Sequence, residues 1–157
     1  MNIRLFLLEL VSTFFYVGFL PAMPGTFASI CGVLLFLAVG HNRVVYLSLT
    51  LLLTALGFFC SGRAEKEVFR RKDAKYIVID EVSGMLTSLA FLPFYDFRII
   101  FAAFVLFRIF DTVKVFPAGR MQGLKGSLGI MSDDLIAAFY TNIILQVVLR
   151  SASFKAW

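Results

Sequence analysis

The sequence has few of the residues that soluble enzymes commonly use for chemistry. Its 157 residues include one histidine and two cysteines. A single histidine, His41, disfavours a histidine-nucleophile phosphatase and a histidine-based metal site. Cys31 and Cys60 lie in apolar runs, and neither has the spacing of a disulfide, a metal site or a cysteine-phosphatase loop. Both cysteines are therefore interpreted as packing residues.

Charged side chains are also scarce. They make up 16% of the chain, whereas hydrophobic residues make up 60%, and the mean hydropathy is +0.88. A soluble domain of this length carries far more surface charge, so the composition favours a polytopic membrane protein. The formal net charge of +5 comes from basic residues in short loops between apolar runs. This placement suits the acidic headgroups of a bilayer, and no nucleic-acid partner is expected.

The apolar segments predict a single all-α domain over residues 1–157. They lie near residues 3–20, 26–39, 44–60, 76–95, 97–113 and 134–149. We expect a polytopic membrane bundle of about four to six apolar helices, although several segments are shorter than the roughly 20 residues of a full span. A polar site can thin the hydrophobic stretch locally. The first segment either spans the bilayer, lies flat on its cytoplasmic face or re-enters the bilayer from that face.

The distribution of basic residues predicts the orientation of the chain. The connections 61–75 and 114–132 carry nine lysines and arginines, whereas the alternate ends carry only Arg43, Arg98, Arg150 and Lys155. The positive-inside rule places the two richer connections in the cytoplasm. Counting helices back and forth then brings five acids to this one face of the membrane. They are Asp80, Glu81, Asp111, Asp133 and Asp134.

Four of these acids form two adjacent pairs beside apolar residues. The spacing predicts that Asp80 and Glu81 lie about one turn inside a helix that begins near Tyr76. Neighbouring carboxylates repel each other unless a cation is close, which favours a metal site over simple stabilisation by the helix dipole. Asp133 and Asp134 precede an apolar segment. An acid there is either a helix N-cap or a metal ligand.

Basic and hydroxyl side chains accompany the acids. Arg108, Asp111 and Lys114 are spaced to lie along one helix face, where they form either an internal ion-pair ladder or a place for a phosphate and a metal. Thr26 is expected to cap a helix whose N-terminus suits a phosphate, with Ser29 one turn further on. The glycines of the 117–132 loop either bring backbone N–H groups to an anion or only make the loop mobile.

Carboxylates without histidine or cysteine ligands suit a hard cation, Mg²⁺ or Mn²⁺. There is no Asp-x-Asp pair of the kind that forms an aspartyl phosphate. The residues that remain indicate metal-assisted chemistry on a phosphorylated substrate that resides in the membrane.

Four stretches together resemble the phosphatidylglycerophosphatase A family, in the family's order. They are 23–29 (MPGTFAS), 79–85 (IDEVSGM), 107–117 (FRIFDTVKVFP) and 126–138 (GSLGIMSDDLIAA). The family removes the terminal phosphate of phosphatidylglycerophosphate with Mg²⁺ at the bacterial inner membrane. The resemblance therefore implies this lipid as substrate, a multi-pass location in that membrane and an active site that faces the cytoplasm. The sequence departs from the family in the loop at 124–127, where a more glycine-rich stretch is expected.

The resemblance also implies roles for individual residues. The implied metal ligands are Asp80, Glu81, Asp111, Asp133 and Asp134. The implied catalytic residues are Asp80, Glu81, Asp111 and Lys114. The implied substrate-binding residues are Arg108, Lys114, Thr26, Ser29 and Lys125.

Two other functions fit the sequence less well than a phosphatase does. The sequence does not indicate an oligomeric state. A phosphotransferase of the CDP-alcohol type needs an Asp-Gly pair where this chain has Asp111-Thr112. A membrane cation carrier would use intramembrane carboxylates, but it needs them near the middle of the bilayer and open to both sides. The expected gathering of the acids at one face favours the phosphatase.

Overall fold

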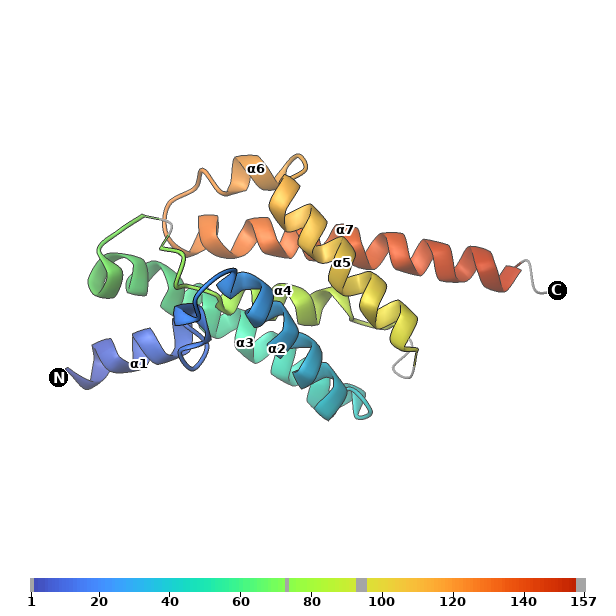
Figure 1. Ribbon diagram of the computed structural model, residues 1–157, viewed down its shortest axis with the longest axis horizontal. Helices are drawn as coiled ribbons and strands as arrows, with labels where there is room; N and C mark the ends of the chain where they lie inside the picture. The colour runs from blue at the N-terminus through green and yellow to red at the C-terminus, as the bar shows by residue number, and fades with distance from the viewer. Residues whose placement is uncertain (1, 73, 93–95, 155–157) are drawn as a thin grey trace.

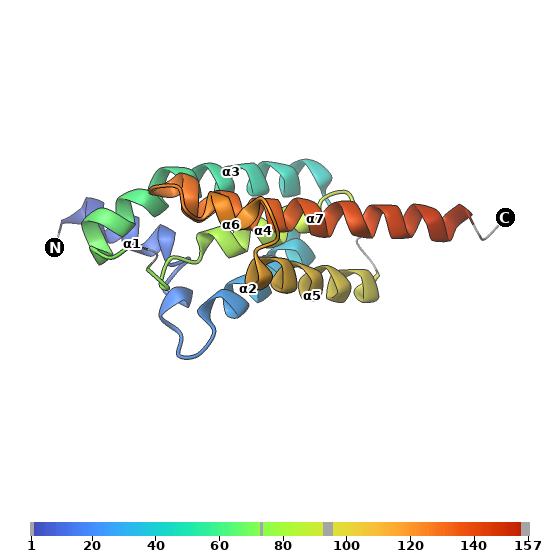
Figure 2. The ribbon, with the colours of Figure 1, turned by 90° about the horizontal axis from the view of Figure 1, so that it is seen from above.

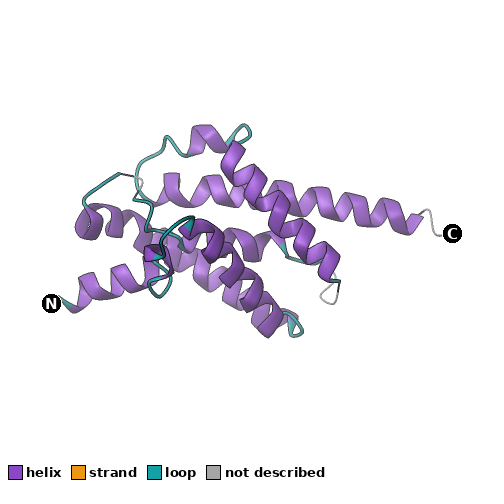
Figure 3. Cartoon of the chain, viewed as in Figure 1, coloured by secondary structure: helices purple, strands orange, loops and turns teal. Residues whose placement is uncertain are grey.

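The structure is a computed structural model that describes residues 2–72, 74–92 and 96–154, with side chains up to Ser151 (Figure 1). In these ranges the chain is helical and has no strand (Figure 3). The α-helices are α1 (Ile3–Ser12), α2 (Pro24–Val39), α3 (Arg43–Arg63), α4 (Ile79–Ser88), α5 (Phe97–Val113), α6 (Ala118–Met121) and α7 (Ser127–Phe154). A 3-10 turn, η1 (Val17–Phe19), and a π-helix, η2 (Ala64–Phe69), complete the elements. The all-α prediction is confirmed.

The short helix α4 lies at the centre of the molecule. Figure 2 shows α3 and α7 on one side of it and α2 and α5 on the other, and α4 contacts all four helices. Val82, Met85 and Leu86 of α4, and Leu89 directly after it, are completely buried in this core. Glycine at position 32 permits the close approach of α2 to α4, because a Cβ there would lie only 2.8 Å from Met85 Cβ.

Two stretches of helix are long and apolar enough to cross a membrane. They are Arg43–Phe69 and Ser127–Ser151, and α2 is a shorter apolar helix. Large apolar side chains point away from the protein along α3, with Val44 74% and Leu51 70% exposed. A contiguous exposed apolar surface of this kind suits a lipid environment. The larger number of spans stays a prediction. Residues 93–95, at the end of the expected 76–95 segment, and Lys155 lie outside the described residues.

The first apolar segment is not one continuous helix, which disfavours the alternative that it spans the bilayer. Helix α1 ends at Ser12, and Phe14, Phe15 and Tyr16 all have positive φ angles. The Thr13 hydroxyl donates to the carbonyl of Glu9 at 2.8 Å and accepts from the Tyr16 N–H at 3.1 Å. These bonds replace the helical ladder and reverse the chain. An α1 of ten residues is too short to cross a bilayer.

Other boundaries were predicted with mixed success. The turn between α2 and α3 is confirmed, and the Asn42 side chain caps α3 by accepting from the N–H groups of Val44 and Val45. Helical structure continues past the expected end of this segment, through Arg63 and η2 to Phe69. The expected 117–132 loop contains α6 and the first turns of α7.

Candidate active site

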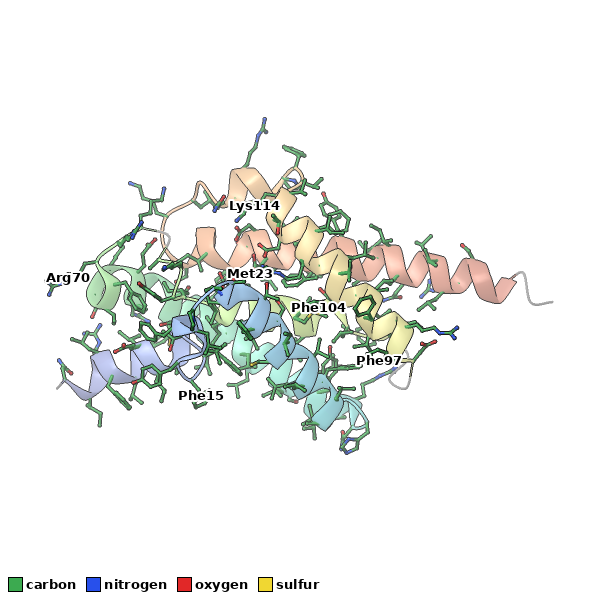
Figure 4. All side chains as sticks on the ribbon, viewed as in Figure 1. Phe15, Met23, Arg70, Phe97, Phe104 and Lys114 are labelled. Atoms are coloured by element: carbon green, nitrogen blue, oxygen red, sulfur yellow. The ribbon has the colours of Figure 1, made fainter. Side chains whose placement is uncertain are left out.

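All five predicted acids line one cavity of about 270 Å³. The cavity lies between the N-terminal ends of α2 and α4, the C-terminal end of α5 and the first half of α7. Figure 4 labels Met23 and Lys114, which line it from α2 and α5. The structure therefore confirms that the acids gather at one place, as the alternation of helices predicted.

The pair Asp80 and Glu81 lies in the first turn of α4, not one turn inside it. Helix α4 begins at Ile79 because the preceding residues are held in a different conformation. The N–H of Val78 donates to the carbonyl of Ser12 at 3.0 Å, which ties the start of α4 to the end of α1. Ile79 is 1% exposed, so its burial fixes the helix start and directs the two acids that follow into the cavity.

Asp133 and Asp134 are the seventh and eighth residues of α7, which begins at Ser127. The N-cap alternative is therefore wrong, because both acids lie nearly two turns inside the helix. Packing against α3 holds these two turns in place. Met131 is completely buried and lies so close to Gly57 that a Cβ there would be 2.5 Å from its sulfur.

Three carboxylates come close enough to share a metal ion. Asp80, Glu81 and Asp134 each offer an oxygen, and these oxygens lie within 4.8 Å of one another. Four buried carboxylate oxygens of the site accept no hydrogen bond from the described residues: Asp80 Oδ1, Glu81 Oε2, Asp133 Oδ1 and Asp134 Oδ2. A buried acceptor without a donor is costly. Burial, together with the charges of Glu81 and Asp134, raises the pKa of Asp80 well above its usual range. This donor set fits a hard divalent cation.

Two cations approach the cluster from α5, each paired with an acid. Arg108 Nη1 lies 2.7 Å from Asp111 Oδ2, as their spacing predicted. Lys114 Nζ lies 2.6 Å from Asp133 Oδ2 on α7 instead of pairing with Asp111. Lys114 ends α5 in a left-handed conformation with φ of 50°, so α5 stops before a ladder along one face is complete. Burial lowers the pKa of Lys114, but the bond to Asp133 and the neighbouring carboxylates outweigh it and raise the pKa overall.

The three other predicted residues do not line this cavity. Thr26 does not cap α2, because that helix begins at Pro24 and Met23 takes the N-cap position. The Ser29 hydroxyl is fully buried, donates to the Gly25 carbonyl at 2.9 Å and accepts from Arg108 Nη1 at 3.5 Å. Ser29 thus helps to hold the Arg108 side chain in position without lining the cavity. Lys125 lines a separate cavity.

Several lining residues were not predicted as site residues, and one glycine and three charged side chains among them affect the geometry or charge of the site. Gly25 lies against the site so closely that a Cβ there would overlap Glu81 Oε1. The buried Glu65 of η2, and the exposed Lys72 and Lys75, come from the connection that follows α3. The charge of this connection could have indicated Glu65, Lys72 and Lys75, because the predicted topology places the connection at the same face as the acids.

The cavity has an excess of negative charge. Six acids and four cations line it, which gives a formal charge of −2 when all are ionised. The acids are Glu65, Asp80, Glu81, Asp111, Asp133 and Asp134, and the cations are Lys72, Lys75, Arg108 and Lys114. One divalent cation would neutralise this charge and leave the basic side chains available to an anion.

The fold and the cavity define a helical protein with exposed apolar helices and an acidic site that suits a cation together with an anionic group. The profile of the family described as phosphatidylglycerophosphatase A matches residues 10–149. This chain belongs to that family and is a lipid phosphatase of it.

Three relatives show the same kinship. A phosphatidylglycerophosphatase A of Haemophilus influenzae is 34% identical over 90% of this chain and 88% of its own length. A phosphatidylglycerophosphatase A of Escherichia coli is 30% identical over 89% of this chain and 82% of its own length. A protein of Bacteroides thetaiotaomicron named "Putative phosphatidylinositol-3-phosphatase" is 33% identical over 90% of this chain and 93% of its own length. No solved structure matches the chain.

Proposed function

We propose that this protein hydrolyses the terminal phosphomonoester of phosphatidylglycerophosphate, with Mg²⁺, to give phosphatidylglycerol and phosphate. One observation carries the proposal. Three carboxylates from α4 and α7 converge with oxygens within 4.8 Å of one another, and two cations from α5 line the same cavity. A phosphomonoester dianion and a hard divalent cation satisfy both sets of groups at once.

Asp80, Glu81 and Asp134 are the residues that would hold the metal, with Asp111 and Asp133 beside them. Bound Mg²⁺ would supply positive charge to the phosphate oxygens and lower the pKa of a bound water. The carboxylate oxygens without hydrogen-bond donors among the described residues are the atoms with free capacity for this role.

The basic side chains of α5 would bind and orient the phosphate. Arg108 can direct a fork of N–H donors at two phosphate oxygens, and Ser29 and Asp111 fix its position. Lys114 adds a point charge, which its ion pair with Asp133 holds in place. The Glu81 carboxylate oxygen that the metal does not use would accept the proton of the attacking water. Asp133 and Asp134 are 5% and 3% exposed, and burial of this kind strengthens the electrostatic interactions that these groups make.

The lipid would reach this cavity from the bilayer. We propose a multi-pass location in the bacterial inner membrane, with the acyl chains in the bilayer and the headgroup at the cytoplasmic face. The two long apolar helices and the exposed apolar side chains support the membrane part of this proposal. The basic connections 61–75 and 114–132 support the cytoplasmic side.

A second candidate substrate follows from the relatives. The Bacteroides thetaiotaomicron protein covers the chain as fully as the two phosphatidylglycerophosphatases do and is named for a phosphatidylinositol 3-phosphate substrate. Both lipids carry a terminal phosphomonoester and an inner phosphodiester. The same cavity chemistry therefore serves either, and a direct comparison decides between them.

The test is phosphate release by the purified protein in neutral detergent. Phosphatidylglycerophosphate, phosphatidylinositol 3-phosphate, phosphatidic acid and lysophosphatidic acid would be compared at equal surface concentration. We expect the highest kcat/KM with phosphatidylglycerophosphate, loss of activity in EDTA and recovery with Mg²⁺. Full activity in excess chelator would refute the metal mechanism. A higher kcat/KM with phosphatidylinositol 3-phosphate would replace the proposed substrate.

A further inference from the structure

The cations of the active-site cavity fall into two sets. The inner set, Arg108 and Lys114, is largely buried, with side chains 23% and 28% exposed, and each member is paired with an acid. The outer set, Lys72 and Lys75, is exposed at the surface. Neither outer lysine forms an ion pair with any residue in the described parts of the chain. The charge of the outer set is therefore available to a ligand, whereas the charge of the inner set is partly neutralised by acids of the protein.

The backbone holds the outer lysines at the edge of the cavity. Lys75 lies within a turn in which the Ile77 N–H donates to the Ala74 carbonyl at 2.9 Å, and Lys72 precedes this turn. Ala74 and Ile77 are 5% and 6% exposed, and both pack in the smaller core cluster with Met131. The Lys75 ammonium also lies 5.4 Å from the centre of the Tyr76 ring. Because buried neighbours fix the backbone on both sides of Lys75, the fold itself positions this lysine at the cavity.

We propose that Lys72 and Lys75 form an outer anion subsite that binds the phosphodiester of the lipid while its terminal phosphate lies at the carboxylate cluster. This inference rests on the proposed function and adds a basis for substrate choice. A lipid with two phosphates separated by a short polyol engages both the inner and the outer cations. Phosphatidic acid, which has only one phosphate attached directly to its diacylglycerol, cannot occupy both sets. The subsite therefore selects for doubly phosphorylated headgroups.

The chain offers matched control residues. Arg63 and Lys66 are also basic and belong to the same 61–75 connection, but they line a different cavity. Their removal changes the net charge of the surface by the same amount without touching the proposed subsite. At roughly 0.15 M salt, screening acts over about 8 Å, so only local contacts should matter.

The experiment compares Lys72→Gln, Lys75→Gln and the double variant with Arg63→Gln and Lys66→Gln. Each is assayed with phosphatidylglycerophosphate, and phosphatidic acid is measured as substrate and as competitor. Each subsite substitution should raise KM for phosphatidylglycerophosphate about 2- to 5-fold, and the double variant about 5- to 20-fold, as for exposed ion pairs. We expect kcat and the affinity for phosphatidic acid to change less than about 2-fold. The controls should resemble the wild type.

The possible results separate this inference from the proposed function. An equal loss of affinity for both lipids, or an equal effect of the control substitutions, would overturn the subsite and leave the phosphatase activity in place. An unchanged KM in the double variant would overturn it as well. If the wild-type protein releases no phosphate from phosphatidylglycerophosphate, the proposed function fails, and the subsite fails with it.

Discussion

At the scale of single residues, a charge-removing substitution separates a metal ligand from a structural acid. Asp134 is 3% exposed and belongs to the trio of close carboxylates. Asp134→Asn keeps its shape, so turnover should fall at least about 100-fold while the fold persists. Without metal, the variant should unfold at a higher temperature because one of several crowded charges is gone. Adding Mg²⁺ should stabilise the wild type and not the variant.

Asp96 provides the matched control for this prediction. Its side chain accepts from the Arg98 N–H at 2.9 Å and caps α5 far from the cavity. Asn is an equally good N-cap, so Asp96→Asn should leave turnover and the response to Mg²⁺ unchanged. The measurements are phosphate release and thermal unfolding in detergent with and without Mg²⁺. Near-normal turnover of Asp134→Asn would remove this residue from the site.

A second residue prediction concerns the glycine beside Glu81. A Cβ at Gly25 would overlap Glu81 Oε1 and lie 3.3 Å from Arg108 Nη1. Gly25→Ala should therefore displace both groups and reduce kcat/KM about 10- to 100-fold, as small misplacements of reacting groups do. Stability should change little, because alanine favours a helix over glycine by about 0.8–1 kcal/mol. In the control Gly123→Ala, the new Cβ would meet only the Arg120 carbonyl at 3.2 Å, and activity should persist.

Sequence reasoning located the acids better than their surroundings. The five acids were found because charge in an apolar chain is rare and because alternating helices return to the same side. Thr26 was misplaced because its helix starts two residues earlier, at a proline that needs no N–H partner. Gly25 could not be found, since its importance depends on a contact with α4 that only the tertiary structure brings about.

At the scale of helices, the approach of α2 to α4 should control both stability and activity. A Cβ at Gly32 would lie 2.8 Å from Met85 Cβ and 3.1 Å from the Val82 carbonyl. Neither atom is at the end of a flexible side chain, so the two helices must separate in Gly32→Ala. We expect a loss of about 1–3 kcal/mol in the free energy of unfolding. Activity should fall too, because α2 also carries Gly25 to Glu81.

A substitution on the outer face of α2 tests this explanation. Leu34 is 59% exposed, so Leu34→Ala removes apolar surface without changing the contact with α4. Its effect on unfolding in detergent should stay within about 0.5 kcal/mol, and its activity should be normal. Equal effects of the two substitutions would show that α2 is generally sensitive and that the close approach at Gly32 has no special role.

The sequence located most helices, and some of their ends. Hydrophobic runs marked α2, α3 and α5. Both ends of α5 and the end of α2 are confirmed, whereas α2 begins two residues earlier than predicted and α3 continues to Arg63. Helix α7 starts seven residues before its expected apolar segment, because burial of Met131 on α3 outweighs the glycines and polar residues there. The π-helix η2 was not predicted. It keeps Glu65 at the cavity within a stretch whose charges suggested a loop.

At the scale of the whole molecule, composition predicted the all-α class and the apolar outer surface. It could not predict that α4, one of the most important helices, is only ten residues long and lies inside the other helices. The hydrophobicity of a short apolar run does not distinguish a helix surrounded by lipid from one surrounded by protein. The number of helices that cross the membrane therefore remains a prediction, because it depends on which apolar surfaces face lipid.

The orientation in the membrane is the last prediction. Lys66 and Lys125 line one cavity, so the two basic connections lie on the same side of any membrane the protein crosses. His41 lies beyond the opposite end of α3, a helix long enough to span. We expect the basic connections in the cytoplasm and His41 outside. Single cysteines at these three positions, in a variant lacking Cys31 and Cys60, would be treated with an impermeant thiol reagent in intact cells. Only position 41 should react until the membrane is permeabilised. Labelling of position 66 but not 125 would contradict the shared cavity, and labelling of both would invert the orientation and place the carboxylate cluster outside the cytoplasm.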